Sequence, residues 1–383
     1  MKKLESYKFS DLYTLSSGIS TSPDQAGHGY PFVSFSTVFN NYFLPENLSE
    51  LMQTSDSERK KFSVKNGDIF LTRTSETLDE LCMSCVATKD IKNATYSGFL
   101  KRLRPNQNDK TYHIFMGFYL RSEYFRKMIN NNAVMTLRAS FNEKIFSYLK
   151  LLLPDYKSQK IIGDLLYSIQ QKIEINNKIN SELEAMTKLI YDYWFVQFDF
   201  PDDSGKPYKS SGGKMVFNED LKREIPQGWK SISISSLLNI KTGKEDANFA
   251  TSNGKYPFFT CGEKTLNCDE YAFEGKAVLL AGNGTFGIKR YVGKFNAYQR
   301  TYVLIANEES HFPHVYYAVK AQAQQLTDGS RGSIVKFITI GDIENINLVL
   351  PSNPSVCSTE LLNNLFNQSD ALINENEELT SLR

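Results

Sequence analysis

The sequence predicts an α+β protein with two mixed domains in tandem, each followed by a long helix. Three observations support this fold class. Residues 158–198 contain no proline, and their apolar residues recur at alternating steps of three and four, which is typical of a helix that packs lengthwise on another helix. Residues 1–154 and 225–351 alternate short β-branched runs with Gly, Asn and Pro turns, as mixed domains do. Finally, the elements of these two blocks recur in the same order.

The repeat is visible as a series of matching segments about 200 residues apart. Five segments of the first block match five of the second in order: Tyr30-Pro-Phe-Val with Tyr256-Pro-Phe-Phe, Asn66-Gly-Asp-Ile-Phe-Leu-Thr with Glu274-Gly-Lys-Ala-Val-Leu-Leu-Ala, His113-Ile-Phe-Met with His314-Val-Tyr-Tyr, Arg138-Ala-Ser with Arg331-Gly-Ser, and Leu153-Pro with Leu350-Pro. We therefore predict a first domain over 1–154, a long helix over 155–200, a polar linker over 201–224, a second domain over 225–351 and a shorter helix over 352–383.

The two helices carry a heptad seam. It contains Ile162, Leu165, Ile169, Asn176, Ile179, Leu183, Met186 and Ile190 in the first helix, and Leu365, Leu372, Asn376 and Leu379 in the second. An asparagine in such a seam lowers stability but fixes the register of the pair. A long core helix of one domain is the simpler interpretation of the first segment. The blocks on either side favour a spacer or assembly helix between domains.

Composition indicates an ordinary globular protein. Of its 383 residues, 41% are hydrophobic and 23% are charged. Apolar runs long enough to cross a membrane are lacking, and the basic N-terminus has no apolar stretch behind it, so we expect neither a membrane span nor a signal peptide. The five cysteines, an odd number, indicate reduced thiols. Together these features predict a cytoplasmic protein.

The net charge of +1 hides an uneven distribution. Residues 1–154 carry 20 Lys+Arg against 15 Asp+Glu, and residues 225–351 carry 13 against 11. The helical segments are acidic, with 5 against 7 over 155–200 and 1 against 5 over 352–383. A polyanion would be attracted to the two domains and repelled by the helices, although the basic excess is too small to establish nucleic-acid binding.

Several motifs together resemble the specificity subunit of type I restriction–modification enzymes. They are Ile225-Pro-Gln-Gly-Trp-Lys at the start of the second domain, Gly67-Asp-Ile-Phe-Leu-Thr-Arg-Thr in the first, the Leu-Pro that closes each domain, and Gln159-Lys-Ile-Ile-Gly-Asp-Leu-Leu leading into a helix that ends Trp194-Phe. The resemblance covers essentially the whole chain.

The resemblance implies that both domains are target recognition domains, each of which reads one half of a split, asymmetric site in double-stranded DNA. It also implies that the two helices form an antiparallel coiled coil, which sets the distance between half-sites and docks methyltransferase subunits, two per chain. Restriction subunits are the further partners. In this family the subunit is not an enzyme and carries no cofactor, because methylation and cleavage belong to its partners.

Other chemistry is weakly indicated. Gly282-Asn-Gly-Thr-Phe-Gly fits a dinucleotide-binding pattern, but a strand-like segment follows it where that fold needs a helix, so we expect a turn between strands. Cys82-Met-Ser-Cys has the spacing of metal ligands without a second ligand pair nearby, and buried thiols are the simpler interpretation. Asp269 with Glu274 and Lys276 is too closely spaced for a nuclease site. We therefore predict neither a catalytic residue nor a metal site.

Candidate DNA contacts are donors on turns beside apolar strands. Arginine reads guanine through two hydrogen bonds, and Gln or Asn reads adenine. The candidates are Arg73, Arg138, Lys289, Arg290, Arg300 and Arg331, and the basic run Lys101-Arg-Leu-Arg104 is expected to contact phosphates. For each arginine, a surface position or an internal ion pair is the alternative structural role.

Two other functions stay open at this point. One is a specificity chain that also supplies nuclease residues. The other is a coiled-coil scaffold that does not read DNA.

Overall fold

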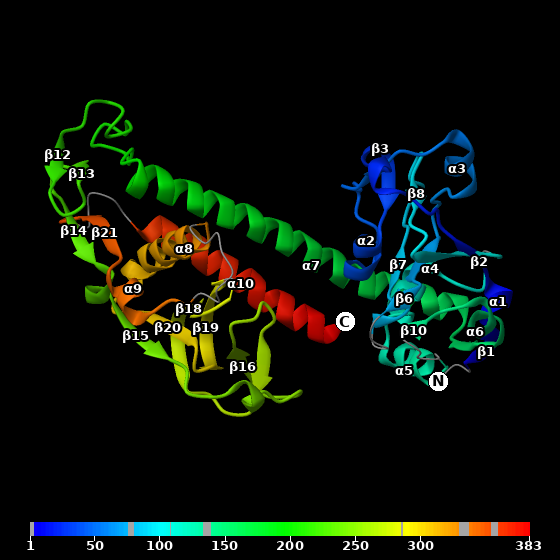
Figure 1. Ribbon diagram of the computed structural model, residues 1–383. Coiled ribbons are helices and arrows are strands. Elements are labelled where there is room, and N and C mark those ends of the chain that lie inside the picture. The colour runs from blue at the N-terminus through cyan, green and yellow to red at the C-terminus, as the bar shows by residue number, and fades with distance from the viewer. Residues whose placement is uncertain are drawn as a thin grey trace. The chain divides into compact units, whose positions relative to one another are not determined.

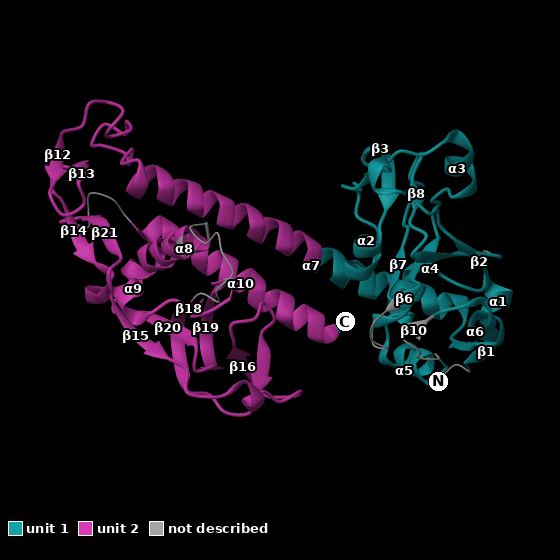
Figure 2. Ribbon diagram, viewed as in Figure 1, with its two compact units in different colours: residues 1–172, 383 teal, residues 173–382 magenta. Residues whose placement is uncertain are grey.

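The computed structural model describes residues 4–75, 80–107, 109–132, 139–284, 286–328, 337–353 and 359–383 (Figure 1). The chain divides into two compact units, residues 1–172 with Arg383 and residues 173–382 (Figure 2). Within the described ranges, every helix is too short or too polar to cross a membrane.

Unit 1 is a mixed α+β unit. Its elements are β1 (Glu5–Lys8), α1 (Phe9–Leu12), β2 (Tyr13–Ser17), β3 (Ala26–Val33), α2 (Phe35–Asn40), β4 (Leu51–Met52), α3 (Asp56–Lys61), β5 (Ile69–Thr72), β6 (Thr74–Ser75), β7 (Ser84–Val86), β8 (Thr95–Tyr96), β9 (Leu100–Pro105), α4 (His113–Tyr119), α5 (Glu123–Asn132), β10 (Ala139–Ser140), α6 (Glu143–Tyr148), β11 (Lys150–Leu153) and the start of α7 (Tyr156–Tyr191).

The central sheet of unit 1 has the strand order β2-β9-β5-β7. Strand β5 lies between β9 and β7, and all four of its residues are buried, which explains its unbroken apolar sequence. Strand β3 pairs with β8 in parallel, and β1 pairs with β11. The aromatic core around Phe9 packs between the sheet and helices α1, α5 and α6.

The motif at the start of α7 attaches this helix to unit 1. Gln159 is buried, its Oε1 accepts from the backbone N–H of Tyr112 at 3.0 Å, and its Nε2 donates to two backbone carbonyls. A Cβ on Gly163 would lie 2.9 Å from the backbone nitrogen of Phe115, so glycine allows the close approach of α7 to α4. The side chain of Tyr167 packs edge-on against Phe43.

Unit 2 contains the rest of α7 and a second mixed unit. Its further elements are a π-helical turn (Asp192–Val196), β12 (Met215–Asn218), β13 (Arg223–Pro226), β14 (Trp229–Ser233), β15 (Leu238–Thr242), β16 (Tyr256–Phe259), β17 (Leu266–Cys268), β18 (Phe273–Ala281), β19 (Ile288–Ala297), β20 (Thr301–Ala306), α8 (Phe312–Asp328), α9 (Ile340–Glu344), β21 (Asn347–Pro351) and α10 (Glu360–Leu382).

Sheet order in unit 2 is β15-β20-β18-β19-β16-β17. Strand β16 pairs with β19 in parallel, as β3 does with β8 in unit 1, while the other neighbours are antiparallel. Strand β19 follows the Gly282–Gly287 turn directly, so this glycine-rich segment joins two strands and opens no helix.

Residues 201–224 are more ordered than a polar linker would be. Strands β12 and β13 pair as a hairpin, with Phe217 opposite Glu224. Asp199 accepts hydrogen bonds from the backbone and the hydroxyl of Ser210 at 2.7 and 2.6 Å. Side-chain hydrogen bonds of Asp and Ser stabilise this segment, which composition alone does not indicate.

An aromatic cluster joins the end of α7 to the Ile225-Pro-Gln-Gly-Trp-Lys motif. Trp229 is buried, and its ring stacks on Phe200 at a centroid distance of 4.8 Å and contacts Phe195 and Phe198. Gly228 before it has φ +83°, which favours glycine. The motif therefore anchors the second domain on the helix.

Helices α7 and α10 contact each other through polar side chains within unit 2. The Nδ2 of Asn176 donates to Oδ1 of Asn376 at 2.9 Å and to the carboxylate of Glu375 at 2.7 Å. Asn180 contacts Ser369. A later residue of α7 therefore contacts an earlier residue of α10, so the two helices run in opposite directions here. The two asparagines that occupy equivalent places in the repeat thus hydrogen-bond to each other.

Half of the predicted α7 seam needs a correction of one residue. Ile162, Leu165, Ile179 and Met186 are 41–63% exposed. The next residue in each case is more buried, namely Gly163, Leu166, Asn180 and Thr187. Ile169, Asn176, Leu183 and Ile190 lie on the buried or half-buried face, as do Leu365, Leu372, Asn376 and Leu379 of α10. The buried stripe of α7 carries Gly, Asn and Thr, so a search for apolar periodicity favours its neighbour.

Candidate nucleic-acid interface

Arg300 lies where a donor could meet a ligand. It is exposed in the turn that precedes β20, beside Gln299. With Asn283, Tyr302 and Phe337 these residues line a depression of about 380 Å³ in unit 2. Its rim combines a guanidinium, two carboxamides and an aromatic ring that is 72% exposed, which are the groups that read base edges.

Arg73 lies at the corresponding end of the central sheet in unit 1. It is exposed and follows β5 directly, and its backbone N–H donates to the carbonyl of Phe99 at 2.9 Å. The phenyl ring of Phe99 is 67% exposed. An arginine and an exposed aromatic side chain therefore share the end of the central sheet in this unit as well.

Arg138 and Arg331 lie outside the described residues. The described segments that follow them pair near Arg73 and Arg300. In unit 1, β10 pairs with β6, which begins directly after Arg73. In unit 2, Phe337 forms a bridge with Asn283, and both line the depression beside Arg300.

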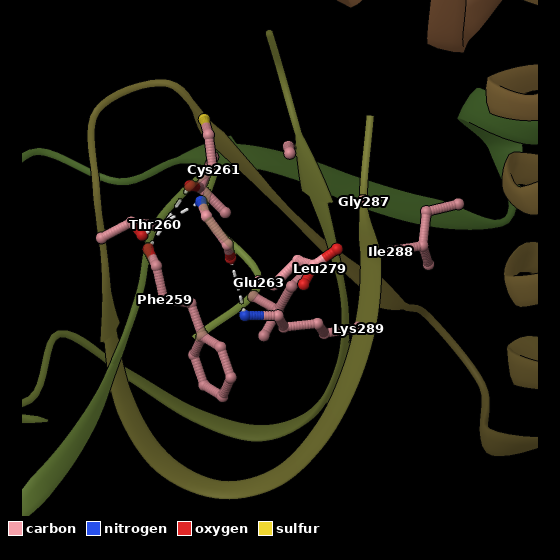
Figure 3. A pocket seen from close by; sticks show the side chains of 11 residues that line it. Phe259, Thr260, Cys261, Glu263, Leu279, Gly287, Ile288 and Lys289 are labelled. Atoms are coloured by element: carbon pink, nitrogen blue, oxygen red, sulfur yellow. Dashed lines mark hydrogen bonds between the residues drawn. The ribbon is translucent and has the colours of Figure 1, made fainter. Parts of the chain in front are cut away.

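Lys289 faces a cavity of about 170 Å³ in unit 2 (Figure 3). Its Nζ donates to the carbonyl of Gly262 at 2.9 Å. Burial lowers the pKa of Lys289, against the opposing charge of Glu263. The lysine thus supports the loop after β16 and remains only half accessible from outside.

Arg290 has a structural role, contrary to its prediction as a DNA contact. Its side chain is 6% exposed, and Nε donates to Asp370 of α10 at 2.9 Å. The same guanidinium contacts Ser369, lies 3.7 Å from Glu184 of α7 and covers the ring of Phe366 at 4.6 Å. An arginine held on every side by its own chain cannot also read a base. It ties β19 to both helices.

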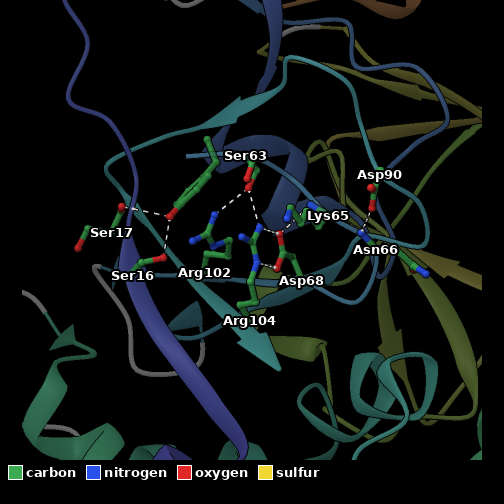
Figure 4. Close-up of polar contacts among 10 residues, drawn as sticks. Ser16, Ser17, Ser63, Lys65, Asn66, Asp68, Asp90, Arg102 and Arg104 are labelled. Atoms are coloured by element: carbon green, nitrogen blue, oxygen red, sulfur yellow. Dashed lines mark hydrogen bonds and ion pairs between the residues drawn. The ribbon is translucent and has the colours of Figure 1, made fainter. Parts of the chain in front are cut away.

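The basic side chains of β9 make contacts within unit 1, and Figure 4 shows those of Arg102 and Arg104. Arg104 makes a paired contact with buried Asp68, at 2.7 and 2.6 Å. Arg102 donates to the carbonyl of Ser63 at 2.7 Å, and Lys101 is 6% exposed. Burial, followed by the charge of Arg73, lowers the pKa of Lys101. The expected phosphate contacts of this run are therefore wrong, because Lys101 and Arg102 are buried and Arg104 is paired with Asp68.

The cysteine pair is buried. Cys82 precedes β7 with φ 58°, Cys85 lies within β7, and burial raises the pKa of the Cys82 thiol. A cluster of three or more His, Cys, Asp or Glu side chains placed to hold a metal ion does not occur among the residues that the structure describes.

A second apolar stripe on α7 is exposed. Its members recur at heptad spacing through the second half of the helix and its π-helical end: Ile175, Ile179, Met186, Leu189, Tyr193 and Val196, which are 37–68% exposed. We call these six residues the outer stripe. Sequence periodicity contains this signal, but one helix with two stripes needs the structure to separate them.

The sequence reading missed Phe99, Asn283 and Phe337 as candidates. The only signal for the two phenylalanines is an aromatic residue in a turn-rich segment, and that pattern does not distinguish an exposed ring from a buried one.

Comparison with known proteins gives a consistent result. The family model described as the type I restriction modification DNA specificity domain matches residues 1–185 and again residues 226–380. The EcoDI specificity subunit of Escherichia coli is 45% identical over 133 residues, which are 34% of this chain and 29% of that protein. The MjaIX specificity subunit of Methanocaldococcus jannaschii is 22% identical over 61% of this chain and 56% of its own length. This chain thus spans less than two thirds of the curated relatives it matches.

Among solved structures, the S subunit of a type I restriction-modification system from M. genitalium is similar over 100% of this chain and 93% of its own, with a TM-score of 0.59 and 14% identity. At this identity the similarity concerns the fold.

Proposed function

Because the chain belongs to the family of type I restriction modification DNA specificity domains, we propose that it is the sequence-specificity subunit of a type I restriction–modification system. The observation that carries the proposal is the double match of the family model, with one match for each half of the repeat. Residues 1–154 and 225–351 are the two target recognition domains in this proposal, and each reads one half of a bipartite site in double-stranded DNA.

Arg73 and Arg300 are the proposed base contacts. Both are exposed at sheet ends, in contrast to the inward-facing cations of β9 and to Arg290. Each arginine can donate two hydrogen bonds to the major-groove edge of guanine. Arg138 and Arg331 join them in this proposal because the segments that follow them border the same edges. Lys289 is a secondary candidate for a phosphate contact.

The helices form the proposed spacer as an antiparallel coiled coil. The opposite course of the Asn176–Asn376 and Asn180–Ser369 contacts supports the antiparallel direction. The acidic balance of both helical segments supports a protein-facing role, since their charge repels phosphate.

The outer stripe is the proposed docking face for methyltransferase subunits, two per chain, to which restriction subunits are then added. Six exposed apolar side chains at heptad spacing fit a partner helix that packs along α7. In this proposal the chain itself is non-catalytic, and its partners methylate and cleave.

The test is a binding selection on a randomised DNA duplex with the complex of this chain and its methyltransferase. The expected motif has two specified half-sites separated by unspecified bases. A single contiguous motif, or none, would contradict the proposal. Cleavage of DNA by the purified chain with Mg²⁺ alone would instead favour a specificity chain with its own nuclease activity.

A further inference from the structure

The turn that enters β9 in unit 1 has the same backbone hydrogen bonds as the turn that enters β20 in unit 2. The N–H of Leu100 donates to the carbonyl of Ser97 at 3.0 Å, and that of Thr301 donates to Tyr298 at 2.8 Å. These bonds close a four-residue turn at each site, residues 97–100 and 298–301.

Each turn is fixed to its surroundings by three further equivalent bonds. The N–H of the first turn residue donates to the preceding parallel strand, from Ser97 to Val33 at 3.0 Å and from Tyr298 to Phe259 at 2.9 Å. The N–H of the second donates to a neighbouring loop, from Gly98 to Ile19 at 2.7 Å and from Gln299 to Glu245 at 3.0 Å. The carbonyl of the third accepts from the residue after the central strand, Phe99 from Arg73 at 2.9 Å and Arg300 from Gly282 at 2.8 Å. The backbone at the two turns is therefore held in the same way.

The side chains at the turn tips differ where the backbone does not. Gly98 and Phe99 occupy the places that Gln299 and Arg300 occupy in unit 2. Phe99, Gln299 and Arg300 are all exposed, and the ring of Phe99 is 67% exposed. A frame that is fixed internally, with a variable exposed tip, is suited to presenting alternative side chains to one class of ligand.

The chemistry of the tips matches base edges. Arginine donates two hydrogen bonds to guanine, whereas an aromatic ring makes apolar contact with the thymine methyl group. We propose, on the basis of the function proposed above, that the third residue of this turn sets the identity of one base pair in each half-site. Phe99 selects a thymine in the first half-site, and Arg300 selects a guanine in the second.

The test exchanges the two residues. The variants Phe99→Arg and Arg300→Phe are compared with the wild-type chain, each in complex with its methyltransferase, by selection on a randomised duplex. Gly98 is left unchanged, because a Cβ there would lie 2.9 Å from the carbonyl oxygen of Ile19. At one position of the first half-site, Phe99→Arg should replace the thymine preference with a guanine preference. Arg300→Phe should make the reverse change in the second half-site, each by roughly 5- to 150-fold.

Phe217→Arg is the matched control. Phe217 is 57% exposed on the β12–β13 hairpin, so this substitution adds the same charge at a site away from the turn. It should leave both half-sites unchanged. An unchanged motif in both exchange variants, with a bipartite wild-type motif, would overturn the role of the turn and leave the proposed function intact. A wild-type complex without a bipartite motif would overturn the proposed function itself. Circular dichroism and thermal melting of each variant establish that it is folded.

Discussion

Arg290 places a positive charge in a site that its own chain fills. Asp370 accepts from Nε, Ser369 contacts a terminal nitrogen and Phe366 covers the guanidinium face. A buried ion pair contributes little relative to an apolar replacement of the whole pair, but removal of one partner leaves the other charge buried and unpaired. Residues of this kind are therefore sensitive to single substitution.

We expect Arg290→Met to destabilise unit 2 by about 3–5 kcal/mol, because Asp370 would lose its partner while remaining 17% exposed. Calorimetric unfolding of the purified chain measures the change. Lys294→Met is the control, since Lys294 lies 4.0 Å from Glu274 with both side chains well exposed, and should cost less than about 1 kcal/mol. Equal stability of the two variants would contradict the buried role.

His314 should make the stability of unit 2 dependent on pH. The ring is 2% exposed against Phe195, and burial, with a smaller contribution from His311, lowers its pKa to about 3 from the ordinary value of 6.5. Between pH 6.5 and 3, His314 is protonated in the unfolded chain and neutral in the folded chain. Its contribution to the unfolding free energy is therefore fully present above pH 6.5 and is lost as pH falls towards 3.

His314→Phe, which keeps the ring, should abolish this dependence. Between pH 7 and pH 5 the wild-type chain should lose about 2 kcal/mol more unfolding free energy than the variant. Urea titrations at both pH values give this difference directly. An identical loss in both proteins would mean that His314 takes up its proton as readily in the folded state as in the unfolded state.

Single residues were the hardest part to predict from sequence. Arg73 and Arg104 both lie in short runs of apolar and polar residues, yet one is exposed and the other pairs with buried Asp68. Long cationic side chains reach several ångströms, so their surroundings depend on contacts distant in sequence. Local sequence alone does not contain that information.

At the scale of elements, α7 combines two stripes on one helix. The inner stripe is polar in part, through Asn176, Asn180 and Thr187, and packs within unit 2. The outer stripe is more apolar and exposed. The existence and length of the helix were predictable because it lacks proline and keeps a heptad period. The identity of the buried face was not predictable from sequence, because the outer stripe is more hydrophobic than the inner one.

Under the proposed function, charge in the outer stripe should prevent docking of the methyltransferase. The double variant Met186→Glu with Leu189→Glu replaces two side chains that are 50% and 68% exposed, so folding should be unaffected while co-purification falls at least tenfold. Val216→Glu with Phe217→Glu makes the same chemical change on the β12–β13 hairpin and should co-purify normally. Full co-purification of the α7 variant would show that another face binds the partner.

For the whole molecule, the repeat was the most predictable feature. Matching segments in constant order indicated two similar domains, and the parallel pairs β3–β8 and β16–β19 place the Tyr30 and Tyr256 segments equivalently in their sheets. The offset between the halves depends on loops of different length. The exact equivalence of Phe99 with Arg300 therefore required the backbone hydrogen bonds.

Under the proposed function, the distance between half-sites should follow helix length. One heptad inserted in α7, with a matching heptad in α10, lengthens the pair by about 10.5 Å, close to three base pairs of duplex DNA. We expect the unspecified gap in the selected motif to grow by about three base pairs with both half-sites unchanged. Altered half-site bases would contradict the spacer role of the helices.

The outer stripe also affects how much of this protein can accumulate in a cell in the absence of its partner. A chain made in excess of its partner leaves six apolar side chains in water along one helix, and such surfaces promote aggregation and recognition by quality-control proteases. Under the proposed function, the supply of methyltransferase then limits the supply of DNA reader. In the same proposal, a surplus of reader without the modifying enzyme would direct nuclease subunits to unprotected host sites, and the exposed outer stripe offers a route by which such a surplus would be removed.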